Sequence, residues 1–180
     1  MKKTNSLSCS TIERIATILR THFNIRDDSY FPIYEVISYL ENKGMLTVQI
    51  MDDNDPIFNE DVPALYNPYD NFIYLKESVL EEYENNEYRS NFTLAHELFH
   101  FIQHQVLSFE FEEVDDCAAY CNSEWQANEF AGQLLIPQKY VYLEVDELIR
   151  RFHVTEHCAL IRKLKDKNRK NKKSPNNGTK

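Results

Sequence analysis

The sequence predicts an α+β fold, and three features of the chain carry this prediction. Helical periodicity of apolar residues opens the chain, strand-like segments follow between residues 46 and 75, and helical periodicity returns from residue 92 onward. Strands that are grouped apart from the helices favour a sheet covered by helices on one side. The chain has 180 residues and shows no internal repeat or linker, so we expect a single domain over residues 1–165.

Two helices are expected before the first strand. Ser10 and Glu13 have the spacing of a capping box for the first helix. Pro32 suits the first position of the second helix, and Gly44 suits its end. Two helices followed so soon by strands are too few for a complete helix-turn-helix domain, so any DNA-reading partner is expected on a separate chain.

Three strand-like segments come next, at residues 46–51, 62–66 and 72–75. The last two flank the turn-forming residues 67–71, Asn-Pro-Tyr-Asp-Asn, which predict a hairpin. We therefore expect a small antiparallel sheet just before the next helix.

The helix expected around residues 92–102 contains the sequence His96-Glu97-Leu98-Phe99-His100. Two histidines four residues apart lie on one face of a helix, so both imidazoles can bind one zinc ion while Glu97 faces a metal-activated water. This HExxH pattern occurs by chance in roughly one per cent or less of chains of this length. A third ligand is needed to support the site, because catalytic zinc takes three protein ligands and a water.

A second helical segment, residues 121–135, supplies a candidate for the third ligand. Four residues share one face of it by the i, i+3, i+4, i+7 rule, namely Glu124, Ala127, Asn128 and Ala131. The small residues favour close packing on the HExxH helix. Glu124 is then aimed at the metal, and Asn128 can be hydrogen-bonded to a ligand. In the alternative, Glu129 is the ligand and Glu124 is a surface residue.

Together these segments resemble the ImmA/IrrE family of metallopeptidases. The similarity rests on residues 92–100 (FTLAHELFH) and 124–137 (EWQANEFAGQLLIP), with looser similarity at 151–155 and 160–164. It covers roughly residues 30–165. Phe99 departs from the pattern, because the family usually has glycine at this position. Phe99 is not a ligand, so the departure concerns packing more than chemistry.

The resemblance implies a zincin-like fold of the gluzincin type, in which a small antiparallel sheet packs on the helices that carry the zinc ligands. It implies His96, His100 and Glu124 as ligands of Zn²⁺ and Glu97 as the catalytic general base. The implied function is that of a zinc-dependent endopeptidase, a hydrolase that cleaves a specific protein. In this family the substrate is typically a helix-turn-helix repressor of a mobile element or stress response, and its cleavage releases transcription.

Two other functions remain open at this point. A metal-bound protein without catalysis could act as a regulator or antitoxin-like binding protein, and an interaction module could carry the HExxH pattern by accident. The intact Glu97 favours the enzyme, since a structural metal site needs no general base. For a peptidase, the simplest way to hold an extended substrate is as an added strand along residues 72–75 or their hairpin partner 62–66.

Other potential ligands are not expected to bind the metal. His104 continues the histidine spacing to i+8, but it lies about 12 Å along the helix axis from His96. The four cysteines lack CxxC spacing and are expected to be reduced thiols. A redox or metal role for Cys117 and Cys121 is the weaker alternative. The full set is Cys9, Cys117, Cys121 and Cys158.

The net charge of −9 is unevenly distributed along the chain. Residues 162–180 contain nine basic residues and one acidic residue, a charge of +8, which leaves −17 for residues 1–161. The acidic body is therefore expected to repel nucleic acid. Residues 166–180 are expected to form a basic, disordered tail that acts as a solubilising terminus or contacts nucleic acid or an acidic partner. Because no long apolar segment or signal sequence is apparent, we expect a cytoplasmic protein without membrane contact.

Overall fold

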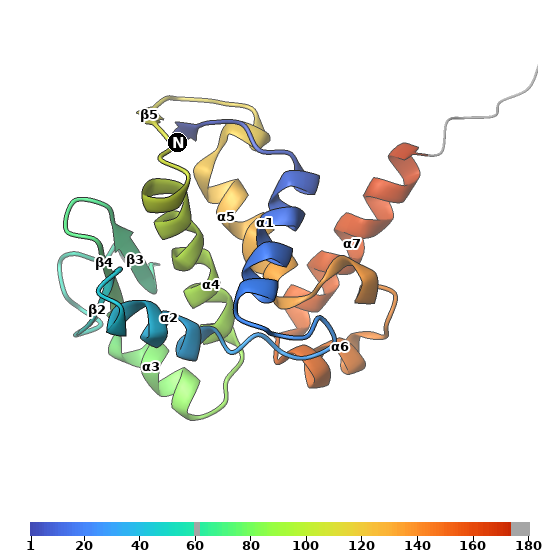
Figure 1. Cartoon of the computed structure of the whole chain (residues 1–180), viewed down its shortest axis with the longest axis horizontal. Helices are drawn as coiled ribbons and strands as arrows, with labels where there is room; N and C mark the ends of the chain where they lie inside the picture. The colour runs from blue at the N-terminus through green and yellow to red at the C-terminus, as the bar shows by residue number, and fades with distance from the viewer. Residues whose placement is uncertain (60–61, 174–180) are drawn as a thin grey trace, which may run out of the picture.

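The computed structural model describes residues 1–59 and 62–173, and it has the predicted α+β composition (Figure 1). The helices are α1 (Cys9–His22), α2 (Ile33–Asn42), α3 (Glu77–Glu84), α4 (Arg89–Phe101), α5 (Ser123–Leu135), α6 (Val145–Phe152) and α7 (Glu156–Lys173). The strands are β1 (Lys2–Thr4), β2 (Thr47–Met51), β3 (Ala64–Asn67), β4 (Phe72–Lys76) and β5 (Phe111–Glu113). Within the described residues, no helix is both long and apolar enough to cross a membrane.

The first two helices begin close to where the sequence signals place them. The side chain of Ser8 caps α1, because its Oγ accepts a hydrogen bond of 3.1 Å from the backbone N–H of Thr11. Ser10, expected to be the cap, instead lies inside the first turn. Pro32, expected at the first position of α2, instead directly precedes its first residue, Ile33. The helix signals thus predicted the elements correctly and the first cap to within one turn.

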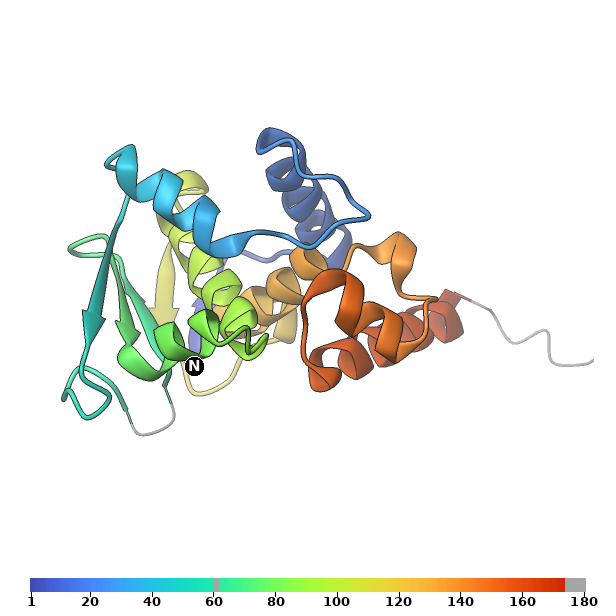
Figure 2. The same ribbon diagram turned by 90° about the horizontal axis from the view of Figure 1, so that it is seen from below.

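Strands β2, β3 and β4 form a three-stranded sheet at one end of the molecule, opposite α6 and α7 (Figure 2). The expected hairpin is present as the antiparallel pair β3 and β4. The expectation of an entirely antiparallel sheet is wrong, because β2 pairs with β4 in parallel. Parallel neighbours cannot be joined by a tight turn, and here residues 52–63 and β3 intervene before the chain returns as β4. Strand β4 is therefore central and β3 is an edge strand.

Helices α4 and α5 pack against each other at the centre of the molecule (Figure 1). Ala127 and Ala131 of α5 are fully buried, which lets the two helices approach closely, as the sequence predicts. Phe99 is also fully buried, and its ring stacks on that of Phe130 with centroids 4.4 Å apart. The side chain that replaces the usual family glycine is thus accommodated by an aromatic partner on α5.

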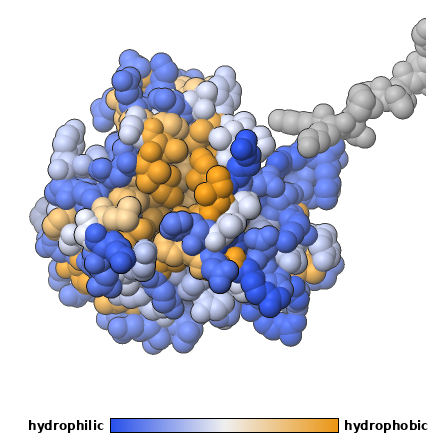
Figure 3. All heavy atoms as spheres, viewed as in Figure 1, coloured by the Kyte–Doolittle hydropathy of each residue, from blue (hydrophilic) through white to orange (hydrophobic). Residues whose placement is uncertain are grey.

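Helix α1 covers a second side of α5 and is tied to it by a buried cation. Arg20 donates through Nη1 to the carbonyl oxygen of Leu134 at 2.7 Å and through Nη2 to that of Arg26 at 2.8 Å. The first bond uses a carbonyl group in the last turn of α5, where carbonyl groups have no partner within the helix, and the second ties the loop after α1 to the same side chain. On the face of the molecule seen in Figure 3, apolar side chains gather between α1 and α4.

The expected domain boundary at residue 165 does not coincide with the end of an ordered element. Helix α7 continues to Lys173, so the expectation of disorder is wrong for residues 166–173. Asp166 is buried and accepts a hydrogen bond of 2.5 Å from Gln138, and Arg169 pairs with Glu13 at 3.2 Å. Asp166 and Arg169 share one helical face with Arg162 at the i, i+4, i+7 spacing. Through this face the basic segment packs on the rest of the protein as a helix. The expectation for residues 174–180 lies outside the described residues.

Candidate metal centre

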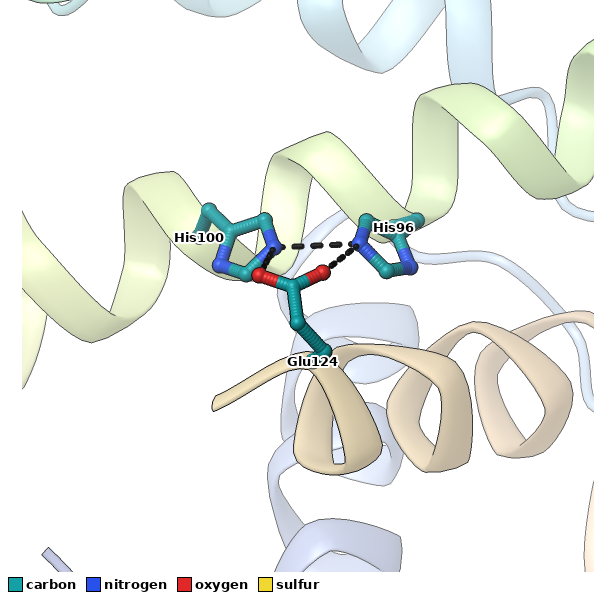
Figure 4. Close-up of side chains that lie close together, drawn as sticks. All are labelled: His96, His100 and Glu124. Atoms are coloured by element: carbon teal, nitrogen blue, oxygen red, sulfur yellow. Dashed lines mark hydrogen bonds and ion pairs between the residues drawn. The ribbon is translucent and has the colours of Figure 1, made fainter. Parts of the chain in front are cut away.

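The structure brings together His96, His100 and Glu124, the three residues expected to bind metal (Figure 4). Both histidines project from one face of α4, and Glu124 projects toward them from the first turn of α5. The Nε2 atoms of the two histidines are 3.0 Å apart. The carboxylate oxygens of Glu124 lie 3.2 Å from His96 Nε2 and 3.5 Å from His100 Nε2.

These distances and donor types fit a tetrahedral zinc ion. Ligand atoms about 2.0–2.1 Å from a common tetrahedral centre are about 3.3 Å from one another. The two nitrogens are 3.0 Å apart, and Oε2 and Oε1 of Glu124 lie 3.2 Å from His96 Nε2 and 3.5 Å from His100 Nε2, so each separation is close to that value. Two imidazole nitrogens and one carboxylate oxygen are also a ligand set that zinc commonly takes in catalytic sites.

The charge state of Glu124 suits a metal ligand. Hydrogen bonds from His100 and His96 hold the pKa of this carboxyl well below its usual range. The alternative ligand Glu129 points elsewhere, because its side chain is buried against Lys165 and Gln133, each at 2.7 Å. The structure thus separates the two glutamates, and only Glu124 belongs to the cluster.

Each histidine is oriented by an amide oxygen on the side away from Glu124. His96 Nδ1 lies 3.2 Å from Oδ1 of Asn128, the contact expected from the sequence, and His100 Nδ1 lies 3.0 Å from Oε1 of Gln103. An amide oxygen can only accept, so each Nδ1 must carry the proton. A neutral imidazole with its proton on Nδ1 keeps on Nε2 the lone pair that a metal ion needs, and without the metal a protonated Nε2 can donate to Glu124.

Gln103 belongs to a buried amide chain that the sequence analysis missed. Gln103 donates to Oε1 of Gln126 at 2.7 Å, and Gln126 donates to the carbonyl oxygens of Asn5 and Tyr120, each at 2.8 Å. Both glutamines are fully buried. Gln103 lies in a π-helical turn, Ile102–Val106, that directly follows α4. A glutamine within the apolar flank of the HExxH pattern was the available signal.

Glu97 lies beside the three-residue cluster but outside it. Its Oε2 accepts a hydrogen bond of 2.7 Å from the backbone N–H of Tyr66, and its Oε1 lies 4.0 Å from His96 Nε2. Burial raises the pKa of this carboxyl above its ordinary value. One oxygen is thus held by the edge strand β3, while the other faces the cluster.

Residues 56–162 match the Peptidase M78 family, described as the IrrE N-terminal-like domain. The chain belongs to this family. The matched region contains the HExxH pattern and Glu124, so the IrrE-like, metallopeptidase-type domain includes the whole His-His-Glu cluster.

The fold of this Peptidase M78 chain is also similar to that of a Mycobacterium tuberculosis transcriptional regulator. The TM-score is 0.55 at 19% sequence identity, and the similarity covers 84% of this chain and 54% of the regulator. The chain thus spans about half the length of that protein. A comparison with curated proteins found no match.

A cleft of about 420 Å³ opens onto the cluster of this Peptidase M78 domain. Strand β3 forms one wall, and His104 and Phe111 lie at one side. The ring of His104 stacks on Phe111 with centroids 3.9 Å apart, and burial lowers the pKa of this histidine to about 4. His104 is not part of the cluster, as expected from its distance along the helix, and it lines the cleft as a neutral imidazole.

The cysteines also lie outside the cluster. All four are free thiols in the structure, and none joins His96, His100 and Glu124 among the described residues. Cys158 is buried, and burial raises the pKa of its thiol to about 11, so it stays protonated at neutral pH.

Proposed function

We propose that this Peptidase M78 domain is a zinc-dependent endopeptidase, with His96, His100 and Glu124 as zinc ligands and Glu97 as the general base. The observation that carries the proposal is the arrangement of the two glutamates. The carboxylate of Glu124 contacts both histidines at 3.2 and 3.5 Å, whereas that of Glu97 is anchored to strand β3 and stays 4.0 Å from His96. A purely structural metal site would not need the second carboxylate.

The zinc ion, when bound, would lower the pKa of its water to about 7 and polarise the substrate carbonyl. Glu97 is positioned to take the proton of the attacking water through Oε1, because Oε2 is engaged by Tyr66. Glu97 then passes this proton to the leaving amine as the peptide bond breaks. Asn128 and Gln103 keep the histidine rings in the tautomer that the site requires.

Strand β3 is the element that could hold an extended substrate. The central position of β4 excludes residues 72–75 as a free edge, which corrects one of the two alternatives from the sequence. Tyr66 turns its backbone N–H away from β4 toward Glu97. Because backbone directions alternate along a strand, Ala64 turns its own N–H to the same open edge. A peptide added there would run through the cleft that contains Glu97.

The substrate we propose is a helix-turn-helix repressor on a separate chain in the cytoplasm. Resemblance to the ImmA/IrrE family supports this proposal. The direct test is incubation of the zinc-loaded protein with a candidate helix-turn-helix repressor, first any that a neighbouring reading frame encodes, with Glu97→Gln as the matched control. Cleavage by the parent alone supports the peptidase. Binding without cleavage by either protein would favour a non-catalytic, metal-bound regulator.

A further inference from the structure

A second cavity, of about 570 Å³, adjoins the metal cleft. The two cavities share four lining residues, which are Pro63, Phe92, Thr93 and Asn128. Residues of α7, Ile161 among them, line the second cavity but not the metal cleft. The second cavity therefore extends the cleft toward α7.

The shared residues place the second cavity on one side of the metal centre. Thr93 lies three residues before His96 on α4, and Asn128 lies four residues after Glu124 on α5. Pro63 directly precedes strand β3. The second cavity is thus at the start of β3, and a peptide added along the open edge of β3 would reach it past Pro63.

The direction of such a peptide decides which of its residues reaches the second cavity. Antiparallel strand pairs outnumber parallel ones about two- to three-fold, so we take the peptide to run antiparallel to β3. Its C-terminal part then lies at the start of β3. Glu97 contacts Tyr66, which is further along β3 than Pro63. With the scissile bond beside Glu97, the residues that follow this bond lie at the second cavity.

The walls of the second cavity are mostly apolar. The ring of Phe92 is partly buried, and Ile161 is 38% exposed. Cys158 keeps its proton at neutral pH, because burial raises the pKa of its thiol to about 11, and a protonated thiol behaves as a small apolar group. Apolar walls of this kind suit an apolar part of a ligand.

Two of the cations that line the second cavity have acidic partners outside it. Arg89 pairs with Glu82 at 3.5 Å, and Lys165 pairs with the buried Glu129 at 2.7 Å. Neither glutamate lines the cavity. The charges of these two cations are therefore compensated by the protein itself.

The third cation, Arg162, contributes its hydrocarbon stem. Only 2% of this residue is exposed, and its Nη2 donates to the carbonyl oxygen of Ile136 at 3.1 Å. A Cβ atom at position 132 would lie 3.0 Å from Cδ of Arg162, so the stem lies flat against Gly132. The guanidinium is thus buried in the protein, and the methylene groups add to the apolar surface between α5 and α7.

We propose that the second cavity is a specificity subsite for a large apolar side chain, such as Leu, Met or Phe, of a residue that follows the scissile bond. Ile161 is the residue of α7 that contacts this side chain. Continuity with the metal cleft identifies the substrate itself as the occupant. The volume of about 570 Å³ is sufficient for such a side chain. As a substrate subsite, the assignment rests on the proposed peptidase function.

The first test is cleavage of a mixed peptide library by the zinc-loaded protein, with the products sequenced by mass spectrometry. We expect large apolar residues to be enriched at one position after the scissile bond. Replacement of that residue by Ala in a single peptide should lower kcat/KM about 10- to 100-fold, because the burial of a large apolar side chain is lost. Cleavage without this enrichment would overturn the subsite.

Variants of α7 show whether this preference arises in the second cavity. Ile161→Ala should reduce it about threefold or more, and Ile161→Glu about tenfold or more, since the latter places a charge in an apolar cavity. Leu164→Ala is the matched control, because Leu164 is an exposed apolar residue of the same helix that does not line the cavity. The same preference in the parent and in both Ile161 variants would reject Ile161 as the contact.

The second test does not depend on cleavage. We would titrate the zinc-loaded protein with N-acetyl-leucinamide and with N-acetyl-alaninamide, and follow binding by NMR. The leucine compound should bind about tenfold more tightly and should shift the methyl signals of Ile161 but not those of Leu164. Equal binding of the two compounds, or shifts that leave Ile161 unaffected, would overturn the subsite without the need for any variant to fold.

The two tests together separate the subsite from the peptidase proposal. Absence of cleavage, combined with tighter binding of the leucine compound at Ile161, would reject the peptidase and keep the apolar site. Cleavage combined with equal binding of the two compounds would keep the peptidase and reject the subsite.

Discussion

The backbone N–H of Tyr66 donates a hydrogen bond of 2.7 Å to Oε2 of Glu97, which joins the edge strand β3 to the buried carboxylate of the HExxH pattern. Tyr66 itself pairs with Ile73 of the central strand β4. The position of the Glu97 carboxylate therefore depends on the sheet as well as on its own helix. Any peptide that adds to β3 would lie next to this carboxylate.

Substitution of Glu97 by Gln should abolish most peptide hydrolysis while zinc content and fold are retained. The amide can still accept the hydrogen bond from Tyr66, but it cannot take a proton from water, and loss of a general base costs about 10²- to 10⁴-fold in rate. The measurement is kcat/KM on a cleaved peptide, with metal analysis of both proteins. Equal rates for parent and variant would reject Glu97 as the base.

Substitution of His100 or Glu124 by Ala should remove most of the bound zinc, which we expect at about one ion per chain. Glu129→Ala is the matched control, because Glu129 lies on the same helix but contacts Lys165. This control should keep its zinc and lose thermal stability, since it leaves the Lys165 ammonium without its partner. Full zinc content in Glu124→Ala, together with loss in Glu129→Ala, would show that the third ligand is wrong.

Gln103→Leu should weaken zinc binding about 10- to 100-fold, because the orienting hydrogen bond to His100 Nδ1 is lost. Gln105→Leu is the control, since Gln105 lies in the same π-helical turn and donates to the hydroxyl of Tyr66 instead of contacting a ligand. Competition with a chelator of known affinity measures the effect. If both variants bind zinc equally well, Gln103 has no orienting role.

Ala64→Pro should raise KM by roughly tenfold with little change in zinc content, because proline removes an N–H from the open edge of β3. Ile50→Pro tests the opposite edge of the same sheet. The N–H of Val48 in β2 points outward to Glu41, so Ile50, two residues on, also directs its N–H outward. A similar rise in KM for both variants would point to a general effect on the sheet and against strand addition.

Deletion of residues 166–180 should lower the melting temperature by about 2–4 °C or more, which corresponds to about 1 kcal/mol in a chain of this size. The deletion removes the contacts of Asp166 with Gln138 and of Arg169 with Glu13. Deletion of residues 174–180 alone is the control that leaves these contacts in place. An unchanged melting temperature after the longer deletion would show that the end of α7 contributes little to stability.

The sequence was sufficient where local geometry decides the outcome. His96 and His100 share a helix face because four residues make slightly more than one turn, whatever surrounds the helix. The small residues Ala127 and Ala131 correctly predicted that α5 packs closely on α4. That packing carries Glu124 to the histidines, and the fold class follows from the same periodicities.

The sequence was insufficient where the outcome depends on which strands pair and on which side chains meet between different elements. The hairpin of β3 and β4 follows from its turn, but the parallel pairing of β2 depends on the path of a long connection. The basic composition of residues 166–173 suggested disorder, yet a helical face of Asp166 and Arg169 finds partners on other elements. Gln103 gave little local indication of its role, because its partner Gln126 is on a different helix.

The sequence by itself therefore determined the HExxH helix, the face of α5 that packs on it and the α+β class, because each depends on the spacing of residues along one element. Only the tertiary structure decided which edge of the sheet is open, which glutamines support the histidines and where Arg162 lies. Those features join residues far apart in the chain, such as Tyr66 and Glu97 or Gly132 and Arg162. The packing of the whole chain brings each pair together, since no local spacing relates its two members.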